Sequence, residues 1–523
     1  MTSETRKVMG RAALVIFGAT VFGRILGLVR EQVIAYFFGA SAATDAFFLA
    51  YKAPFMLSLT VAGALTATFV PVFTERYVAG AEERAWKLTV SMANLIFLIL
   101  LGTTLVLVLL APWVVPLVGY GFNAETADKA VFLFRILMPA VIFTGLVGLF
   151  TGVMNSLKRF GLPAFATSLG AAGAIAFMLL FSDSWGITSL AVGTVFGSFL
   201  SLAVLVPSLR KLGMRYVPRI DRHLPGMREV GMLVWPILIG SAVGKVSIFA
   251  DMVLASTLEE GSISALNFAE KLFQLPLGLF VAGITVPIFP LLSRHVAAGE
   301  PERLKETLAF GLRMIAFIMV PATVGLIVLR GPVITLLFQH GAFETSDTSR
   351  TAWALLFYAL GLFSYAGRDT LTRVFYAYQD TRTPVKISVV AVVLNIAVSL
   401  VLMRFLGVGG LALGTTIAMT VNMIVLMELL RRRLGPMGFG RLLRSFLRIL
   451  AAAGIMGLAV WGVDGLLVGW VEVGNLGLGA RVAAGMAAGV VVYVGSAALG
   501  GIRELDEAKE MLREVFPRSS PEV

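Results

Sequence analysis

The chain contains no cysteine and only three histidines, and charged residues make up 14% of its 523 residues. The absence of cysteine excludes disulfides, thiol catalysis and cysteine-ligated metals. The small charged fraction, with a hydrophobic fraction of 58% and a mean hydropathy of +0.88, excludes an ordinary soluble enzyme. The sequence also lacks a phosphate-binding loop, a dinucleotide fingerprint and a Ser/His/Asp set. Any energy source must therefore be an ion gradient or the membrane potential.

Long apolar segments are abundant in this sequence. A transmembrane helix needs about 20 mostly apolar residues, and about fourteen segments reach that length. They cover residues 12–38, 45–74, 88–111, 128–156, 163–182, 187–208, 230–257, 264–292, 308–329, 351–378, 384–404, 408–430, 445–463 and 478–499. The predicted fold is an all-α polytopic membrane protein with about 14 transmembrane helices.

Lysine and arginine are concentrated in alternate connections between these segments. Residues 76–87, 210–228 and 431–444 are rich in them, whereas residues 39–44, 182–186 and 259–261 are poor. The positive-inside rule then places both termini and all the basic connections in the cytoplasm. The net charge of +12 is explained by this topology and by anionic lipid, so it does not indicate nucleic acid.

The chain also repeats itself internally. Residues 45–54 align with 267–276 and residues 186–194 with 407–415, at an offset that stays near 221. Each copy holds six predicted spans, which indicates parallel repeats and the two-lobe plan of transporters, with the substrate site between the lobes. The predicted divisions are an N-lobe at 1–209, a basic cytoplasmic linker at 210–228, a C-lobe at 229–433, two further spans within 434–500 and a cytoplasmic tail at 501–523. Residues 504–515 of the tail are predicted to form an amphipathic helix.

The first two predicted helices carry charges at membrane depth. Arg24 and Arg30 lie in the first apolar segment, and Asp45 and Lys52 lie in the second. Such charges are costly in lipid and usually face a bundle interior or a water-filled cavity. Snorkelling of the arginines to the headgroups is the alternative. Because Arg24 lies roughly 20 Å along the helix from Arg11, at about 1.5 Å per residue, the sequence favours a solvated functional cavity.

The second lobe presents a polar helix face of its own. Glu270 and Lys271 share one face of the eighth segment with Asn267 and Gln274. The repeat places this face opposite Asp45 and Lys52, which favours cavity lining. A structural ion pair between helices is the alternative interpretation.

A cation site can be assembled from Asp251, Asn395, Ser399 and Thr415, whose oxygen atoms suit a hard cation. Only Asp251 is charged, and buried Asn and Ser commonly hold membrane helices together. Polar helix packing is therefore the favoured interpretation of these residues, and the cation site is the alternative.

Several motifs resemble the MviN/MurJ family of lipid II flippases. They are Gly23-Arg24-Ile25-Leu26-Gly27-Leu28-Val29-Arg30-Glu31, Phe38-Gly39-Ala40, Ala43-Thr44-Asp45-Ala46-Phe47-Phe48, Phe69-Val70-Pro71, Ala111-Pro112-Trp113, Leu275-Pro276-Leu277-Gly278 and Thr383-Pro384-Val385-Lys386. The resemblance implies the multidrug/oligosaccharidyl-lipid/polysaccharide exporter fold, with two six-helix lobes and two extra C-terminal helices.

The resemblance also implies roles for particular residues. Arg24 and Arg30 correspond to the family's essential first-helix arginines, and Asp45 to its second-helix acidic residue. Glu270-Lys271 stands where the family has Asp-Arg, and residues 55–62 lack the arginine and glutamate usual there. The family's sodium site corresponds to Asp251, Asn395, Leu411 through its backbone oxygen, and Thr415, while Ser399 replaces an expected aspartate.

The implied function is a flippase that moves undecaprenyl-diphosphate-linked peptidoglycan precursor to the outer leaflet of the bacterial inner membrane by alternating access. We expect Arg24, Arg30, Lys52 and Lys271 to contact the diphosphate, and Asp45 and Glu270 to hold these cations or gate the lobes. The expected partners are the lipid-linked oligosaccharide, membrane lipids and cell-wall synthesis proteins. No cofactor is expected beyond sodium or the membrane potential as driving force. A flippase for another polyprenyl-linked glycan, a cation-coupled drug exporter and a membrane scaffold are the alternatives.

Overall fold

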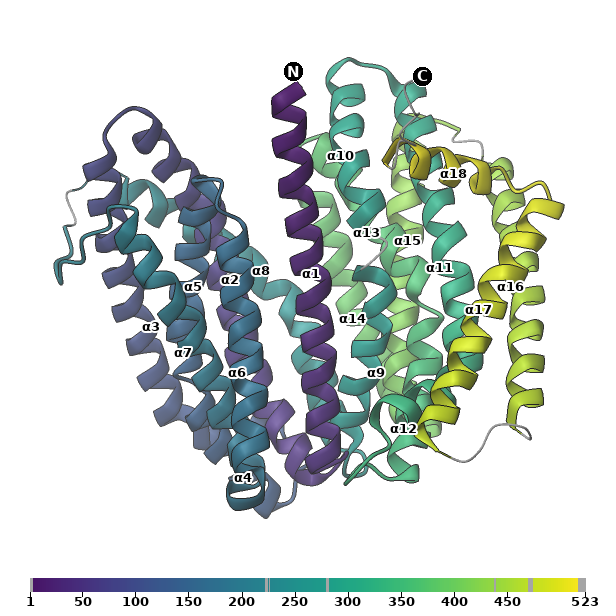
Figure 1. Ribbon diagram of the computed structural model, residues 1–523, viewed down its shortest axis with the longest axis horizontal. Coiled ribbons are helices and arrows are strands. Elements are labelled where there is room, and N and C mark those ends of the chain that lie inside the picture. The colour runs from purple at the N-terminus through teal and green to yellow at the C-terminus, as the bar shows by residue number, and fades with distance from the viewer. Residues whose placement is uncertain are drawn as a thin grey trace, which may run out of the picture. The chain divides into compact units, whose positions relative to one another are not determined.

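The computed structural model describes residues 3–221, 224, 226–278, 282–436, 439–468 and 474–515. The described residues form helices joined by turns and short connections, and they contain no strand. Packing divides the chain into two compact units. Unit 1 comprises Met1–Ser264 with Gly341–Phe343, and unit 2 comprises Ala265–His340 with Glu344–Val523. Figure 1 shows the helices of each unit.

The helices of the first copy and its connection run from α1 to α8. Their bounds are α1 Ser3–Phe38, α2 Ala42–Val78, α3 Glu82–Val118, α4 Ala124–Leu137, α5 Ala140–Ser156, α6 Gly161–Trp185, α7 Ile187–Lys211 and α8 Met227–Ser256. The remaining helices are α9 Ser262–Pro276, α10 Ala282–Ala297, α11 Pro301–Phe338, α12 Thr345–Ala359, α13 Leu362–Ala377, α14 Arg382–Leu406, α15 Val408–Leu434, α16 Phe439–Val468, α17 Asn475–Leu499 and α18 Arg503–Val515.

Three of the apolar segments predicted as single spans are each two helices. Residues 128–156 form α4 and α5, residues 264–292 form α9 and α10, and residues 351–378 form α12 and α13. Pro139 separates α4 from α5, because proline has no amide hydrogen and clashes with the preceding turn. Each of the other predicted segments coincides with one helix. Ten helical stretches within the described residues are long and apolar enough to span a membrane, so the count of fourteen stays a prediction.

The internal repeat is visible in the backbone as paired residues with left-handed φ. The pairs are Gly39 and Gly261, Gly80 and Gly299, Lys158 and Gln379, Gly186 and Gly407, and Gly213 and Gly435. The members of each pair are separated by 219 to 222 residues, which agrees with the predicted offset. Lys158 and Gln379, at φ 57° and 58°, are the most informative pair, because residues other than glycine seldom adopt this region. The repeated fold is therefore confirmed at the level of single residues.

The compact units do not follow the predicted lobe boundaries. Helix α8 and the start of α9 pack with unit 1, whereas the repeat assigns both to the second lobe. The lobe division at residues 209 and 229 remains a prediction from the repeat. The linker residues 222, 223 and 225 lie outside the described residues.

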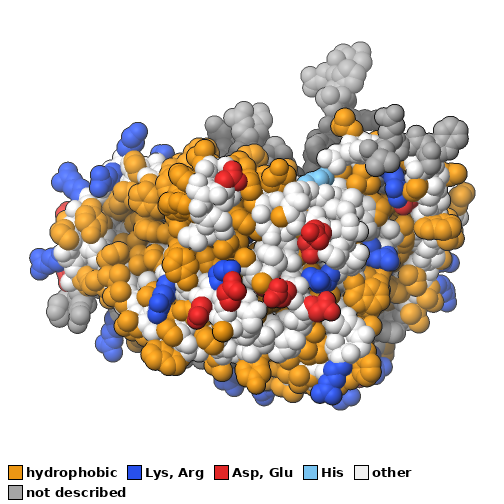
Figure 2. Space-filling view, turned by 90° about the horizontal axis from the view of Figure 1, so that it is seen from below, with side chains coloured by type: hydrophobic (Ala, Val, Ile, Leu, Met, Phe, Trp, Pro, Cys, Tyr) orange, Lys and Arg blue, Asp and Glu red, His pale blue; other side chains and the backbone are white. Residues whose placement is uncertain are grey.

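Large apolar side chains cover much of the surface of the units (Figure 2). On unit 1 they include Leu109 at 70% and Trp113 at 70% exposure, and on unit 2 Leu458 at 72%. Exposure of this much apolar area to water would be unfavourable, whereas its contact with lipid tails is not. The surface therefore agrees with a protein that is embedded in a bilayer.

The C-terminal helices complete unit 2. Tyr493 of α17 donates a hydrogen bond to the backbone oxygen of Phe317 on α11 at 2.7 Å, and Ile502 and Leu505 join the same buried cluster. Glu504, the second residue of α18, pairs with Arg313 of α11 at 2.9 Å and accepts from Ser445 of α16 at 2.6 Å. Helix α18, predicted over residues 504–515, is confirmed and is fastened to α11 and α16 by this cluster.

Candidate functional site

Arg30 and Glu31 form an ion pair in the interior of unit 1. The Arg30 Nη2 atom lies 2.9 Å from Glu31 Oε1, and the Glu31 side chain is only 1% exposed. The Arg30 guanidinium lies over the ring of Tyr51 on α2, 5.4 Å from its centroid. The Nε atom of Arg30 is buried and has no hydrogen-bond partner among the described residues. One edge of the guanidinium is thus anchored, and donors remain for an anion.

Arg30 and Tyr51 line a cavity of about 250 Å³ inside unit 1. Its other walls come from α2, α5, α6 and α7, with Leu137 from the end of α4. Gly170 and Gly197 allow α6 and α7 to approach closely, because a Cβ atom on Gly197 would lie 2.2 Å from the Gly170 backbone oxygen. Pockets for drug-sized ligands usually measure about 300–1,000 Å³, so this cavity can hold part of a large headgroup.

Hydroxyl side chains form much of the cavity wall. They are Ser58, Thr144, Thr167, Thr194, Ser198 and Ser201. Each of them already donates its hydrogen to a backbone oxygen of a helix, as Thr144 does to Ala140 and Ser58 does to Pro54. Their oxygens therefore remain as acceptors. The cavity combines one cation with a wall of acceptors, which suits a ligand that carries both an anionic group and hydroxyl or amide donors.

Arg24 and Lys52 are half-buried in the same unit. Arg24 lies on α1, six residues before Arg30, and Lys52 follows Tyr51 on α2. Neither is among the residues that line the 250 Å³ cavity. Of these three predicted cations, Arg30 therefore lines the cavity. Arg24 and Lys52 lie on α1 and α2 but do not line it.

Asp45 fastens the start of α9 to α2. Its carboxylate is buried, and it accepts hydrogen bonds from the Gly261 amide at 2.7 Å, the Ser264 amide at 2.7 Å and the Ser264 hydroxyl at 2.6 Å. A carboxylate at the first turn of a helix satisfies amides that lack helical partners and matches the positive end of the helix dipole. In this conformation Asp45 is a tether, and it would contact a ligand only after these bonds break.

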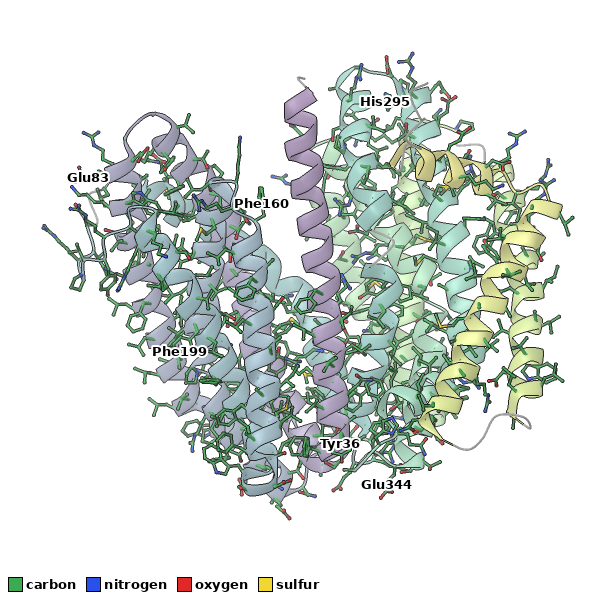
Figure 3. All side chains as sticks on the ribbon, viewed as in Figure 1. Tyr36, Glu83, Phe160, Phe199, His295 and Glu344 are labelled. Atoms are coloured by element: carbon green, nitrogen blue, oxygen red, sulfur yellow. The ribbon has the colours of Figure 1, made fainter. Side chains whose placement is uncertain are left out.

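Further contacts close the same end of unit 1. The Gly121 amide donates to Ser256 Oγ at 3.1 Å, and a Cβ atom on Gly121 would lie 2.3 Å from the Ser256 backbone oxygen. Tyr36, labelled in Figure 3, lies near the end of α1. Its backbone oxygen accepts from the Ala342 amide at 2.8 Å. The turn between α8 and α9 and residues 341–343 are thus held against the helix ends of the first copy.

Glu270 and Lys271 lie on α9 within unit 2, and both are half-buried. Gln274 donates to Glu270 Oε1 at 2.8 Å, across one helical turn. Their part in a common site with Arg24, Arg30 and Lys52 stays a prediction.

The predicted cation ligands are divided between the units. Asp251 belongs to unit 1, whereas Asn395, Ser399, Leu411 and Thr415 belong to unit 2. Ser399 donates to Asn395 Oδ1 at 2.9 Å, and Thr415 donates to the Leu411 oxygen at 3.1 Å. A Cβ atom on Gly414 would lie 2.2 Å from Ser399 Oγ, so Ser399 stands where α14 and α15 meet. The unit 2 residues satisfy one another as polar helix packing would. Within the described chain, no group of three His, Asp or Glu side chains could hold a metal.

Two residues of the site were not among those predicted from the sequence. Tyr51 supports Arg30, and its position directly before Lys52 in a charged stretch was an available signal. Ser264 holds Asp45, and the Gly261-Ser262 helix start pointed to a cap without indicating the partner. Asp45 and Ser264 lie 219 residues apart, which is why sequence spacing could not pair them.

Comparison with known proteins gives a consistent result. The family model described as lipid II flippase MurJ matches residues 34–476. The probable lipid II flippase MurJ of Vibrio cholerae serotype O1 is 30% identical over 519 residues, covering 95% of this chain and 97% of that protein. The probable lipid II flippase MurJ of Haemophilus influenzae is 32% identical over 468 residues, covering 84% of this chain and 90% of that protein.

Solved structures agree with the sequence relatives. A lipid II flippase MurJ in an inward closed conformation matches with a TM-score of 0.78 at 27% identity, covering 93% of this chain and 98% of that chain. An inward-facing multidrug resistance transporter of the MATE family, in the MOP superfamily, matches with a TM-score of 0.69 at 16% identity, covering 81% and 98%. The second likeness shows the fold alone.

Proposed function

Because the chain belongs to the lipid II flippase MurJ family, we propose that the Arg30 cavity binds the diphosphate of lipid II. The protein is a flippase, a transporter and not an enzyme, that moves this peptidoglycan precursor across the bacterial inner membrane, in which it is a multi-pass protein. The single observation that carries the assignment of the site is the half-anchored Arg30 guanidinium in an otherwise neutral, hydroxyl-lined cavity.

The geometry gives each group a task. Glu31 and Tyr51 fix the orientation of Arg30, so that its remaining N–H groups are directed to an incoming phosphate oxygen without a further loss of side-chain freedom. Charge-assisted arginine–phosphate hydrogen bonds are among the strong ones. The hydroxyl oxygens of the cavity wall accept hydrogen bonds from the sugar hydroxyls or peptide amides of the headgroup. A phosphate alone would leave these acceptors unused. Arg24 and Lys52 serve as further cations on the path to or from this cavity.

The tether at Asp45 supplies a way to gate the path. Its three hydrogen bonds hold the first turn of α9 against α2. Opening this end of unit 1 requires that these bonds break, and their re-formation closes it again. We therefore assign Asp45 to gating, which is one of the two roles expected for it from the sequence.

The orientation in the membrane is part of this proposal. Both termini and the linker at 210–228 lie in the cytoplasm, as the positive-inside rule requires. Reporter fusions at Gly226 and Gly261 should then report opposite sides of the membrane. Reports from the same side would contradict this orientation. Sodium or the membrane potential is the proposed driving force, and association with cell-wall synthesis proteins remains a prediction.

Two of the alternative functions that the sequence left open are not favoured. A drug exporter of this fold would need an acidic cavity for cationic drugs, whereas the charged residue that lines the cavity here is Arg30. A flippase for another polyprenyl-linked glycan is disfavoured by the lipid II flippase relatives over nearly the whole chain.

The proposal is tested by transport in cells depleted of their own lipid II flippase. Arg30→Ala should lower precursor flipping, normalised to folded protein, by about ten-fold or more, because a charge-assisted hydrogen bond is worth about 1.5–3 kcal/mol. Arg30→Lys should rescue in part, since lysine supplies a point charge without the planar fork. Arg135→Ala is the matched control, because Arg135 is exposed on α4 and bonds the Val108 oxygen at 3.4 Å. Full activity of Arg30→Ala would place the headgroup elsewhere.

A further inference from the structure

A second, separate cavity lies in unit 2, between α11, α12 and α16. It measures about 790 Å³ and shares no residue with the Arg30 cavity. Gly331 of α11 and Gly454 of α16 line it, and a Cβ atom added to either would meet no atom within 4 Å. The cavity is thus bounded in part by bare backbone, with open space where side chains could have been.

The cavity carries one uncompensated positive charge. Arg330 lines it, and the one hydrogen bond its guanidinium makes in the described structure goes from Nη1 to the Ile327 oxygen at 2.5 Å. No carboxylate of the described residues lies within ion-pair distance of Arg330. Asp464 also lines the cavity, but Arg481 holds it through two bonds of 2.5 and 2.8 Å. An anionic group would therefore be attracted to Arg330.

Hydrogen-bond acceptors line the same cavity as Arg330. Thr348 donates its hydroxyl hydrogen to Gln339 Oε1 at 3.0 Å and Ser349 donates to the Thr345 oxygen at 3.0 Å, which leaves both hydroxyl oxygens as acceptors. Pro332 has no amide hydrogen, so the Val328 carbonyl lacks its usual helical donor. Both residues line the cavity. One cationic donor beside several acceptors fits a phosphate whose headgroup also carries hydroxyls.

Two tryptophans place the cavity at a membrane interface. Trp353 of α12 is 40% exposed and Trp461 of α16 is 70% exposed, and both line the cavity. Arg330 lies eight residues before the end of α11, which is about 12 Å at 1.5 Å per residue. Tryptophan is enriched at the level of lipid headgroups, and an arginine at this depth reaches the same level.

We propose that this cavity is a binding site for an anionic glycerophospholipid, specifically phosphatidylglycerol. Arg330 takes the phosphate, the Thr348, Ser349 and Val328 oxygens accept from the glycerol hydroxyls, and an acyl chain lies over Gly331 and Gly454. Basic pockets between transmembrane helices on the cytoplasmic side of membranes hold anionic lipid headgroups, and the same attraction between cation and phosphate applies at the outer leaflet. The lipid belongs to the leaflet that surrounds this end of unit 2. In the orientation proposed above, this is the outer leaflet. The inference does not depend on Arg30 or on the transported substrate.

The test measures dioleoylphosphatidylglycerol binding to the purified full-length protein by native mass spectrometry, with dioleoylphosphatidylcholine as the zwitterionic comparison. The wild type should bind phosphatidylglycerol more tightly than phosphatidylcholine. Arg330→Gln should raise the dissociation constant for phosphatidylglycerol about ten-fold or more, the usual loss for a charge-assisted hydrogen bond. Gly454→Leu should have a similar effect by filling the cavity, and it should fold normally because its Cβ meets open space.

Matched controls separate this site from general effects of charge and bulk. Arg404→Gln removes an exposed arginine near the end of α14, and Gly495→Leu adds bulk at an exposed glycine of α17 whose Cβ would also meet no atom within 4 Å. Both should bind phosphatidylglycerol as the wild type does. Equal binding of the two lipids, or an unchanged affinity in Arg330→Gln and Gly454→Leu, would overturn the proposal. Lipid II that displaces phosphatidylglycerol from the wild type, and binds Gly454→Leu less well, would assign the cavity to the transport path and also overturn it.

Discussion

At equivalent points of the two repeats, the first copy carries Arg30-Glu31 where the second carries Met252-Val253, nine and eight residues before the paired glycines Gly39 and Gly261. The backbone at these glycines is left-handed in both copies, with φ of 59° and 86°. The chemistry differs completely, because a buried ion pair beside a cavity is replaced by apolar side chains. The comparison teaches that the repeat builds the fold twice but builds this cationic site once.

The second helix of each copy shows the same divergence. Tyr51 and Lys52 of α2 correspond to Phe273 and Gln274 of α9 at the repeat offset. Tyr51 supports the Arg30 guanidinium, whereas Phe273 packs against Tyr358 and Tyr365 at 5.7 and 5.4 Å between ring centroids. In the second copy the position serves an aromatic core. The charges of the first copy are therefore an addition to a common frame, as expected of a functional site.

The largest expected effect on stability comes from Asp45, whose counterpart in the second copy is Asn267. Asp45→Ala leaves two buried amides and a hydroxyl without their acceptor. Each unsatisfied buried donor costs about 1–3 kcal/mol, so we expect a loss of about 3 kcal/mol or more in the free energy of unfolding. Thermal unfolding of the purified protein checks this, with Asn267→Ala as the half-buried counterpart. Equal losses in the two variants would show that the tether is not special to the first copy.

A smaller effect is expected at the turns that hold Lys158 and Gln379. In the second copy Asp380 accepts from the Thr383 amide at 3.0 Å and from its hydroxyl at 2.8 Å, whereas the first copy has Arg159 there. Asp380→Ala should cost about 1 kcal/mol, the usual value of a helix-start cap, and Arg159→Ala should cost almost nothing.

The same turn predicts a dependence on pH. Hydrogen bonds from Thr383 hold the pKa of Asp380 below its ordinary value. A lowered pKa in the folded state means that Asp380 contributes stability above the unfolded pKa of about 4, and that this contribution is lost as the pH falls further. Thermal unfolding of wild type and Asp380→Ala should therefore converge at acid pH. A constant difference down to acid pH would show that Asp380 acts through something other than its charge.

Much of this molecule could be predicted from its sequence, and the reasons for the exceptions are physical. Apolar length located nearly every helix, and the turn motifs revealed the repeat. The break at Pro139 was missed because proline is tolerated within membrane helices, so it does not by itself end a predicted span. The depth of Arg24 and Arg30 indicated a cavity, but its hydroxyl wall comes from helices α2, α5, α6 and α7, which sequence spacing cannot bring together. The Asp45 tether was missed for the same reason.

The smallest expected effect concerns sodium. Asn395 and Ser399 satisfy each other in unit 2, and Asp251 is the one carboxylate of the predicted set. If Asp251 takes part in sodium binding, the wild type should be slightly more stable to heat in sodium than in potassium at equal ionic strength, and Asp251→Asn should remove that difference. A wild type that is insensitive to sodium would leave these residues as helix packing.

The central claim is that the first copy of the repeat supplies the diphosphate site. The most direct measurement is lipid II binding to the purified protein in three forms: wild type, Arg30→Ala and Lys271→Ala. We expect Arg30→Ala to weaken binding about ten-fold or more, because it removes a charge-assisted contact, and Lys271→Ala to weaken it less, because lysine provides only a point charge. Unchanged binding in Arg30→Ala together with a loss in Lys271→Ala would contradict the claim and move the site to the second copy.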